Sequence, residues 1–187
     1  MGGAKLTVAL RGRPLIEYPL AALRTVLDDV AVIAKPDVEL PALQGVMLWI
    51  EPEEPRHPLV GIVEALGLAA GRPVLVCPAD LPCVTPSLVA GICQTSAEDA
   101  PAVIARHAGE TQPLLGLYQP VAAALLADAA RRAEAPVRAS VDAIGPRHFE
   151  VRDAEELFNV NSPEDLLVAR SILDRREQHS AGRASRT

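Results

Sequence analysis

Cysteine, lysine and long apolar runs are all scarce in this chain of 187 residues. Its three cysteines show no C-x-x-C spacing, which excludes a common paired-ligand motif, and we expect them to be small buried residues in a reducing cytoplasm. Apolar runs such as VAVIA and VMLWI are far too short to span a bilayer. No basic stretch leads into an apolar one, as it would in an export signal. The sequence therefore predicts a cytoplasmic protein without a membrane partner.

Positive charge is also limited, since the net charge is −6. A protein that coats nucleic acid needs a broad basic surface, so we expect no nucleic-acid partner. A small anionic substrate is compatible with this charge if cationic groups gather locally. Only Lys5 and Lys35 are lysines, and every other cationic residue is arginine. We expect the compact ammonium of Lys5, close to two glycines, to have a role, whereas chance placement explains Lys35 equally well.

Several catalytic motifs are missing as well. The sequence contains no G-x-S-x-G segment and no convincing Cys–His pairing, which argues against catalysis by a side-chain nucleophile. It also lacks G-x-x-x-x-G-K-[ST], the signature of ordinary P-loop nucleotidases.

Short apolar segments alternate with amphipathic ones, which is typical of an α/β fold with a parallel sheet. Continuous apolar runs predict strands covered on both faces at residues 30–34, 46–50, 74–77 and 102–105. Weaker segments at 114–118 and 149–153 predict edge or antiparallel strands.

Two predicted helices begin with recognisable caps. Thr85 precedes Pro86 and an apolar run, and Ser162 stands three residues before Asp165 in the pattern of a capping box. No linker divides the chain. We therefore expect one domain over residues 1–174, followed by a flexible tail over residues 175–187.

Ligands of open α/β sheets bind beyond the carboxyl ends of the strands, so polar residues at those ends are the site candidates. Asp80 lies in a proline-flanked loop, PADLP, after the strand predicted at 74–77. One carboxylate there suits Mg²⁺, which takes one or two protein carboxylates plus substrate phosphates, although a turn or capping role suits Asp80 too. Glu51 follows the strand at 46–50, where it either accepts hydrogen bonds from a base or ribose or belongs to a solvated acidic loop.

Neutral polar side chains stand beside other predicted element ends. Gln112, Asn159 and Asn161 offer donors and acceptors to a substrate. An asparagine pair before a helix is equally an ordinary capping and turn device.

The order of the segments MGGAKL, GRPLIEY, HPLVGI, PADLP, QPLLGLY and NVNSPEDL resembles the molybdenum cofactor guanylyltransferase family, from Met1 to about Leu173. The resemblance implies a three-layer, Rossmann-like nucleotidyltransferase fold of class α/β with a mostly parallel central sheet. It also implies Mg²⁺-dependent transfer of GMP from GTP to the phosphate of molybdopterin, with release of pyrophosphate. Molybdoenzymes or other cofactor-biosynthesis proteins are the further partners that it implies.

The resemblance also assigns roles by position. Asp80 matches the metal-binding aspartate and, with Lys5, forms the implied catalytic pair. The implied nucleotide-binding residues are Gly2, Gly3, Lys5, Glu51 and Asp80. The implied contacts to the pterin substrate are Gln112, Asn159 and Asn161.

This chain departs from the family pattern in two places. It begins at the methionine inside the glycine loop, so the family's first apolar strand and the first half of that loop are missing. We expect a start codon upstream of Met1, because without a central strand the backbone groups of its neighbours lose their hydrogen-bond partners. Each buried group left without a partner costs about 1–3 kcal/mol. The total stability of a protein is only about 5–15 kcal/mol. Lys35 stands where the family usually has asparagine, which leaves guanine selectivity open. A cytidylyl- or sugar-phosphate nucleotidyltransferase and a non-catalytic truncated homologue are therefore the alternatives.

Overall fold

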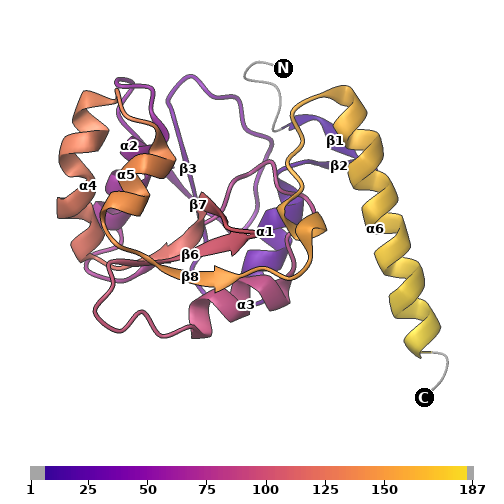
Figure 1. Cartoon of the computed structure of the whole chain (residues 1–187). Helices are drawn as coiled ribbons and strands as arrows, with labels where there is room; N and C mark the ends of the chain where they lie inside the picture. Colours follow the sequence, from indigo (N-terminus) through magenta and orange to yellow (C-terminus); the bar gives the residue numbers. More distant parts are fainter. Residues whose placement is uncertain (1–6, 185–187) are drawn as a thin grey trace.

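The structure is a computed structural model and describes residues 7–184 (Figure 1). Its strands are β1 (Ala9–Leu10), β2 (Arg13–Pro14), β3 (Ala31–Ala34), β4 (Met47–Ile50), β5 (Val74–Val76), β6 (Ala102–His107), β7 (Glu110–Tyr118) and β8 (Arg147–Glu150). Its helices are α1 (Glu17–Arg24), α2 (Pro58–Leu68), α3 (Pro86–Gln94), α4 (Val121–Arg132), α5 (Val137–Ala143), the 3-10 helix η2 (Ala154–Leu157) and α6 (Pro163–Ala184). A strand is present at every predicted apolar run, but β4 is not covered on both faces as predicted, since Met47, Leu48 and Ile50 are 42–57% exposed.

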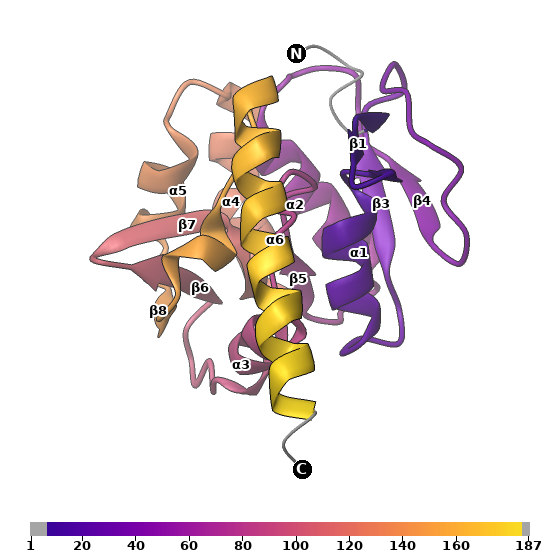
Figure 2. The same cartoon turned by 90° about the vertical axis from the view of Figure 1, so that its right-hand side faces the viewer.

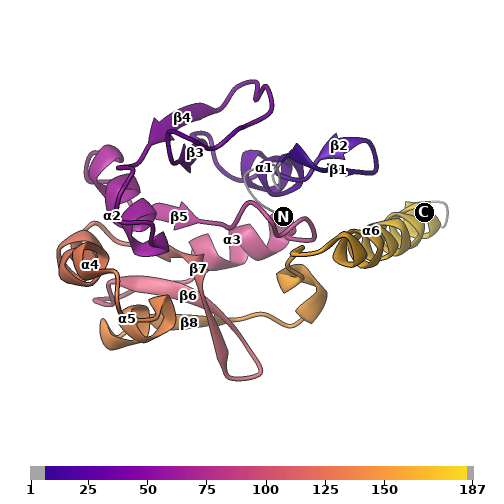
Figure 3. The same cartoon turned by 90° about the horizontal axis from the view of Figure 1, so that it is seen from above.

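The central sheet has the strand order β5-β7-β6-β8. β7 pairs antiparallel with β5 and with β6, and β8 pairs parallel with β6, so β5, β6 and β8 all run in one direction. The weak segment at 114–118 is therefore an antiparallel strand inside the sheet, and β8 is an edge strand. β3 and β4 form a separate parallel pair, drawn above the central sheet in Figure 3.

Helices cover both faces of the central sheet. On one face, α1 and α3 pack against Val103 and Ala105 of β6. On the other face, α2, α4 and α5 pack against Ala102 and Ile104, because successive side chains of a strand point to opposite faces. All four β6 residues are fully buried. Figures 1 and 3 show the resulting layers, and the predicted three-layer α/β fold is confirmed.

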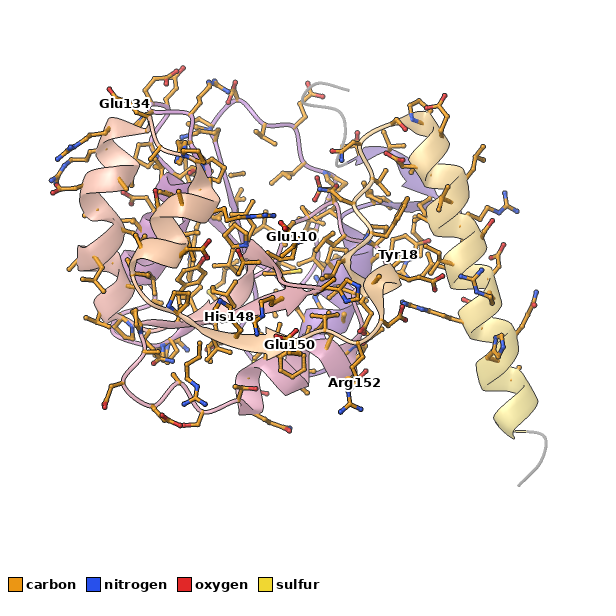
Figure 4. The ribbon with its side chains drawn as sticks, in the orientation of Figure 1. Tyr18, Glu110, Glu134, His148, Glu150 and Arg152 are labelled. Atoms are coloured by element: carbon orange, nitrogen blue, oxygen red, sulfur yellow. The ribbon has the colours of Figure 1, made fainter. Side chains whose placement is uncertain are left out.

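Helix α6 lies outside these layers, beside the β1–β2 hairpin (Figure 2). Leu10 of the hairpin and Ile172 of α6 belong to one small apolar cluster. Tyr18 of α1, labelled in Figure 4, ties the hairpin to the first helix, since its hydroxyl donates to the carbonyl oxygen of Leu10 at 2.6 Å.

Helix α6 continues past residue 174, where the sequence predicted that a flexible tail begins. Arg176 donates to the carbonyl oxygen of Cys83 at 2.6 Å, and Arg175 forms an ion pair with Glu155. Residues 175–184 are therefore helical, and long-range contacts that sequence patterning does not reveal hold the early part of this stretch.

The predicted caps are confirmed. The backbone N–H of Leu88 donates to Thr85 Oγ1 at 3.1 Å. The backbone N–H of Asp165 donates to Ser162 Oγ at 3.2 Å, and the N–H of Ser162 donates to Asp165 Oδ2 at 2.8 Å. Within residues 7–184, no helix has both the length and the apolar character that crossing a bilayer requires.

Candidate nucleotide site

The predicted site residues within the described part of the chain lie where strands end. Lys35 follows β3, Glu51 follows β4, and Asp80 lies in the turn after β5. Gln112 belongs to β7, which runs antiparallel to its neighbours, so the first residues of β7 lie at the carboxyl ends of β5 and β6. In this register Gln112 pairs with Ala105 of β6. Gly2, Gly3 and Lys5 lie outside the described residues.

The strand pair and the central sheet present their carboxyl ends on the same side of the molecule. Asp29 lies just ahead of β3 and Arg72 just ahead of β5, and their side chains form an ion pair. The starts of both strands therefore lie at one end, and Lys35, Glu51 and Asp80 follow at the other. This edge is the place where open α/β sheets bind ligands.

The loop of Asp80 contacts the segment NVNSPEDL. The backbone N–H of Val160 donates to the carbonyl oxygen of Asp80 at 3.0 Å, and the Val160 side chain is fully buried. Asn159 and Asn161, the residues on either side of Val160, are exposed. The backbone N–H of Asn161 donates to Asp165 Oδ2 at 2.8 Å. The structure therefore brings Asp80 and the asparagine pair together, from positions far apart in the chain.

Glu51 is one half of a buried ion pair, which excludes the solvated acidic loop as its environment. Its side chain is 14% exposed, and its Oε2 lies 3.7 Å from Lys35 Nζ. This oxygen is fully buried without a hydrogen bond among the described residues, and it lies 3.2 Å from the place where a Cβ on Gly61 would stand. Burial raises the pKa of Glu51, while the positive charge of Lys35 opposes the rise.

Lys35 fixes the loop that leads from β4 into α2. Its ammonium donates to the carbonyl oxygen of Pro52 and, at 3.0 Å, to that of Pro55. The Lys35 side chain is 10% exposed, so its ammonium is largely covered, although Pro52 in the loop is exposed. The sequence left a role for Lys35 undecided. A lysine directly after an apolar strand, in a chain whose other cations are nearly all arginine, is the signal that points to this role.

The buried thiols are poor nucleophiles. Burial, with the charge of Asp80 adding to it, raises the pKa of Cys77 to about 12. Burial also raises the pKa of Cys83 to about 11. Both thiols are therefore protonated near neutral pH, in agreement with the absence of nucleophile motifs from the sequence.

The position of Asp80 suits a cation that needs few protein ligands. In the part of the chain that the structure describes, no three His, Cys, Asp or Glu side chains stand together as a metal site. Mg²⁺ retains waters and substrate phosphates and often takes only one or two protein carboxylates. A single carboxylate in the turn after β5, that of Asp80, therefore fits Mg²⁺ better than a metal held entirely by protein groups.

Comparison with known proteins places this geometry in context. Residues 1–146 match the family model of the MobA-like NTP transferase domain. A molybdenum cofactor guanylyltransferase of Cereibacter sphaeroides is 33% identical over 177 residues, covering 92% of this chain and 90% of that protein. A molybdenum cofactor guanylyltransferase of Rhodopseudomonas palustris (strain HaA2) is 29% identical over 91% of this chain and 85% of its own length.

Two solved structures show the same fold. Molybdopterin-guanine dinucleotide biosynthesis protein A from Archaeoglobus fulgidus superposes with a TM-score of 0.72 at 20% identity, covering 91% of each chain. The 2-C-methyl-D-erythritol 4-phosphate cytidylyltransferase of Thermus thermophilus superposes with a TM-score of 0.64 at 23% identity, over 92% of this chain and 95% of that one.

Proposed function

The chain belongs to the MobA-like NTP transferase family, a family of nucleotidyltransferases, and on this basis we propose that it transfers GMP from GTP to the phosphate of molybdopterin. The family resemblance predicted from the sequence segments is thereby confirmed. Within the structure, the observation that supports the proposal is the hydrogen bond from Val160 to Asp80. It unites the two segments that carry the metal-binding aspartate and the asparagine pair of the resemblance.

The proposed reaction is a direct transfer. A terminal phosphate oxygen of the pterin forms a bond to the α-phosphorus of GTP, the bond from that phosphorus to the bridging oxygen of the β-phosphate breaks, and pyrophosphate leaves with the electron pair. Such transfers depend on positioning and charge stabilisation and need no covalent enzyme intermediate. Protonated Cys77 and Cys83 are consistent with this route.

The carboxylate of Asp80 would hold Mg²⁺, which when bound supplies positive charge against the phosphates. Lys5 would place a further positive charge on the leaving pyrophosphate, and Gly2 and Gly3 would let the backbone approach the phosphates. These assignments follow the family resemblance.

The remaining polar residues would orient the two substrates. Gln112, Asn159 and Asn161 would hydrogen-bond the pterin. Glu51 would accept hydrogen bonds from the base or ribose through Oε1, since its Oε2 is buried. Lys35 would keep that carboxylate ionised and in place.

Replacing Asp80 with asparagine tests the metal role. We expect Asp80→Asn to lower the rate of pyrophosphate release by at least ~10²-fold, as removal of one electrostatic stabiliser does in other enzymes. Asp128→Asn on the exposed surface of α4 is the matched control and should leave the rate unchanged. A chelator should abolish activity, and Mg²⁺ should restore it. Near wild-type turnover in Asp80→Asn would reject the assignment.

Base selectivity needs its own experiment, because the fold also matches a cytidylyltransferase. Thermal unfolding with Mg²⁺ and either GTP or CTP separates the two, since a ligand at a hundredfold excess over its Kd stabilises by about 2.7 kcal/mol. A shift with GTP and metal-dependent pyrophosphate release support the proposal. A shift with CTP alone favours a cytidylyltransferase, and GTP binding without turnover favours a non-catalytic homologue.

A further inference from the structure

The loop that carries Asp80 runs from the end of β5 at Val76 to the start of α3 at Pro86. Residues 81–84 of this loop are all buried, whereas Asp80 itself is only partly buried. The position of the Asp80 carboxylate therefore depends on what holds the backbone around it.

Residues 153–161, which lead from β8 into α6, hold this loop on both sides of its buried part. Ahead of that part, the backbone N–H of Val160 donates to the carbonyl oxygen of Asp80 at 3.0 Å. After it, Thr85 donates through Oγ1 to the carboxylate of Glu156 in η2. In Figure 1, η2 follows β8 and lies between α3 and α6. The segment that leads to the asparagine pair is therefore attached to the Asp80 loop at two points.

Arg176 of α6 supplies a third attachment, between the other two. Its Nη1 donates to the carbonyl oxygen of Cys83 at 2.6 Å, and its Nη2 donates to Asp153 Oδ2 at 2.7 Å. Asp153 also caps η2, since its Oδ1 accepts from the backbone N–H of Glu155 at 2.9 Å. A guanidinium presents its N–H groups in a fixed fork, so one side chain joins the Asp80 loop to the start of η2.

The surroundings of Arg176 make this attachment stronger than a surface contact. The Arg176 side chain is 25% exposed, and Cys83 is 1% exposed. A hydrogen bond from a charged donor is stronger than one between neutral groups, and a buried carbonyl that loses its donor is costly. Without the guanidinium, we expect the loop to shift until the Cys83 carbonyl regains a partner.

The neighbouring Arg175 provides a built-in comparison. It forms an ion pair with Glu155 of η2, and the two side chains are 49% and 40% exposed. Among the contacts of the described residues, the Arg175 side chain reaches η2 but not the Asp80 loop. Exposed ion pairs of this kind contribute little. The two arginines therefore differ in whether they touch the loop, while they share the helix and the contact with η2.

We propose that Arg176 is a positioning residue, which holds the Asp80 loop against the segment of Asn159 and Asn161 and so sets the place of the Asp80 carboxylate. The inference rests on the proposed function, in which Asp80 holds Mg²⁺. Arg176 acts through the backbone at Cys83 and through η2. Groups that orient a metal ligand from behind typically change metal affinity by about 10–100-fold when they are removed.

The first experiment measures amide hydrogen exchange in the protein without metal or nucleotide. Arg176→Met keeps the apolar stem and removes both donors, and Arg175→Met is the matched control. In Arg176→Met, we expect the amides of Val84 and Val160 to exchange at least ~10-fold faster than in the wild type, because the loop is no longer held. Amides of β6 should keep their rates in both variants. Unchanged exchange at Val84 and Val160, or an equal acceleration in β6, would overturn the proposal.

The second experiment measures pyrophosphate release from GTP and molybdopterin at varied Mg²⁺ concentration. In Arg176→Met, the Mg²⁺ concentration that gives half the maximal rate should rise about 10-fold, a larger effect than that on the maximal rate. Arg175→Met should match the wild type. In Arg176→Ala, guanidinium chloride should lower this Mg²⁺ concentration again, whereas sodium chloride at the same ionic strength should not. If Arg176→Met does not fold, Arg176→Lys, which keeps the charge and one donor, should show a smaller shift in the same direction.

The two experiments separate failure of this inference from failure of the proposed function. If the wild type releases pyrophosphate and Arg176→Met has the same Mg²⁺ dependence, the role of Arg176 is overturned and the function stands. If the wild type releases no pyrophosphate, the proposed function is rejected, and the exchange rates of Val84 and Val160 alone decide whether Arg176 holds the loop.

Discussion

Replacing Lys35 with methionine should destabilise the fold strongly, although the residue lies next to a loop. Methionine keeps most of the apolar stem and removes the ammonium. The change deletes the hydrogen bonds to Pro52 and Pro55 and leaves the Glu51 carboxylate without its counter-charge. The two carbonyls can regain water in the exposed loop, so the main cost comes from Glu51.

The separation of the charges sets the magnitude. At 3.7 Å, a unit charge pair in an effective dielectric constant of about 20 interacts by roughly 4.5 kcal/mol. Breaking a buried pair by removing one partner costs about 3–5 kcal/mol in other proteins. Protonation of Glu51 relieves part of this cost, so we expect Lys35→Met to lose about 3 kcal/mol at pH 7. The double variant Lys35→Met/Glu51→Gln should recover about 2 kcal/mol of that loss, because no charge is left buried.

Urea unfolding followed by Trp49 fluorescence measures these differences in free energy. The cost of Lys35→Met should shrink at pH 5, where Glu51 takes up a proton more readily. Arg131→Met, which breaks an exposed ion pair on α4, is the control and should cost less than about 1 kcal/mol. A loss below about 1 kcal/mol for Lys35→Met, or a loss that Glu51→Gln does not reduce, would refute the role given to this pair.

Three further predictions concern stability. Burial raises the pKa of Glu51, so the folded state holds this proton more tightly than the unfolded state, and stability falls as the pH rises from 4.5 through the folded pKa. In urea unfolding between pH 4 and 7, the free energy of unfolding of Glu51→Gln should rise relative to that of the wild type as the pH increases. A constant difference between the two proteins over this range would contradict the raised pKa of Glu51. Thr85→Ala should lower the free energy of unfolding by about 1 kcal/mol, because the cap of α3 is lost. Thr85→Ser should keep most of the stability that the cap contributes. Gly116→Ala should cost about 1–3 kcal/mol in thermal unfolding, since its Cβ would lie 2.7 Å from the Val103 carbonyl oxygen, whereas Gly67→Ala, with open space around it, should not destabilise.

Signals that act over a few residues were readable from the sequence alone. Continuous apolar runs predicted the strands, because strands covered on both faces need apolar side chains at every position. Thr85 and the Ser162–Asp165 pair predicted the helix starts, because capping bonds join residues three apart or fewer. The order of the segments was enough to predict the family.

The sequence also indicated where a site would form, since each strand end could be located before the fold was known. It predicted Asp80, Gln112 and the two asparagines beside element ends. Asp80 follows β5 and the asparagines lie between η2 and α6, whereas Gln112 lies inside β7, which begins at Glu110 and not at residue 114. It did not predict the position of β7 between β5 and β6, because strand order depends on pairing across the chain.

Tertiary structure alone decided the environment of each candidate. The hydrogen bond between Asp80 and Val160, the Lys35 bonds to Pro52 and Pro55 and the burial of Glu51 all join segments that are separate in sequence. Helix α6 continues beyond residue 174 while Arg175 and Arg176 find partners far along the chain. Periodicity and capping record what neighbouring residues favour. Burial and ion pairing depend on which distant segments of the chain come into contact. In this protein, those long-range contacts determine the charge, the rigidity and the burial of the candidate site residues.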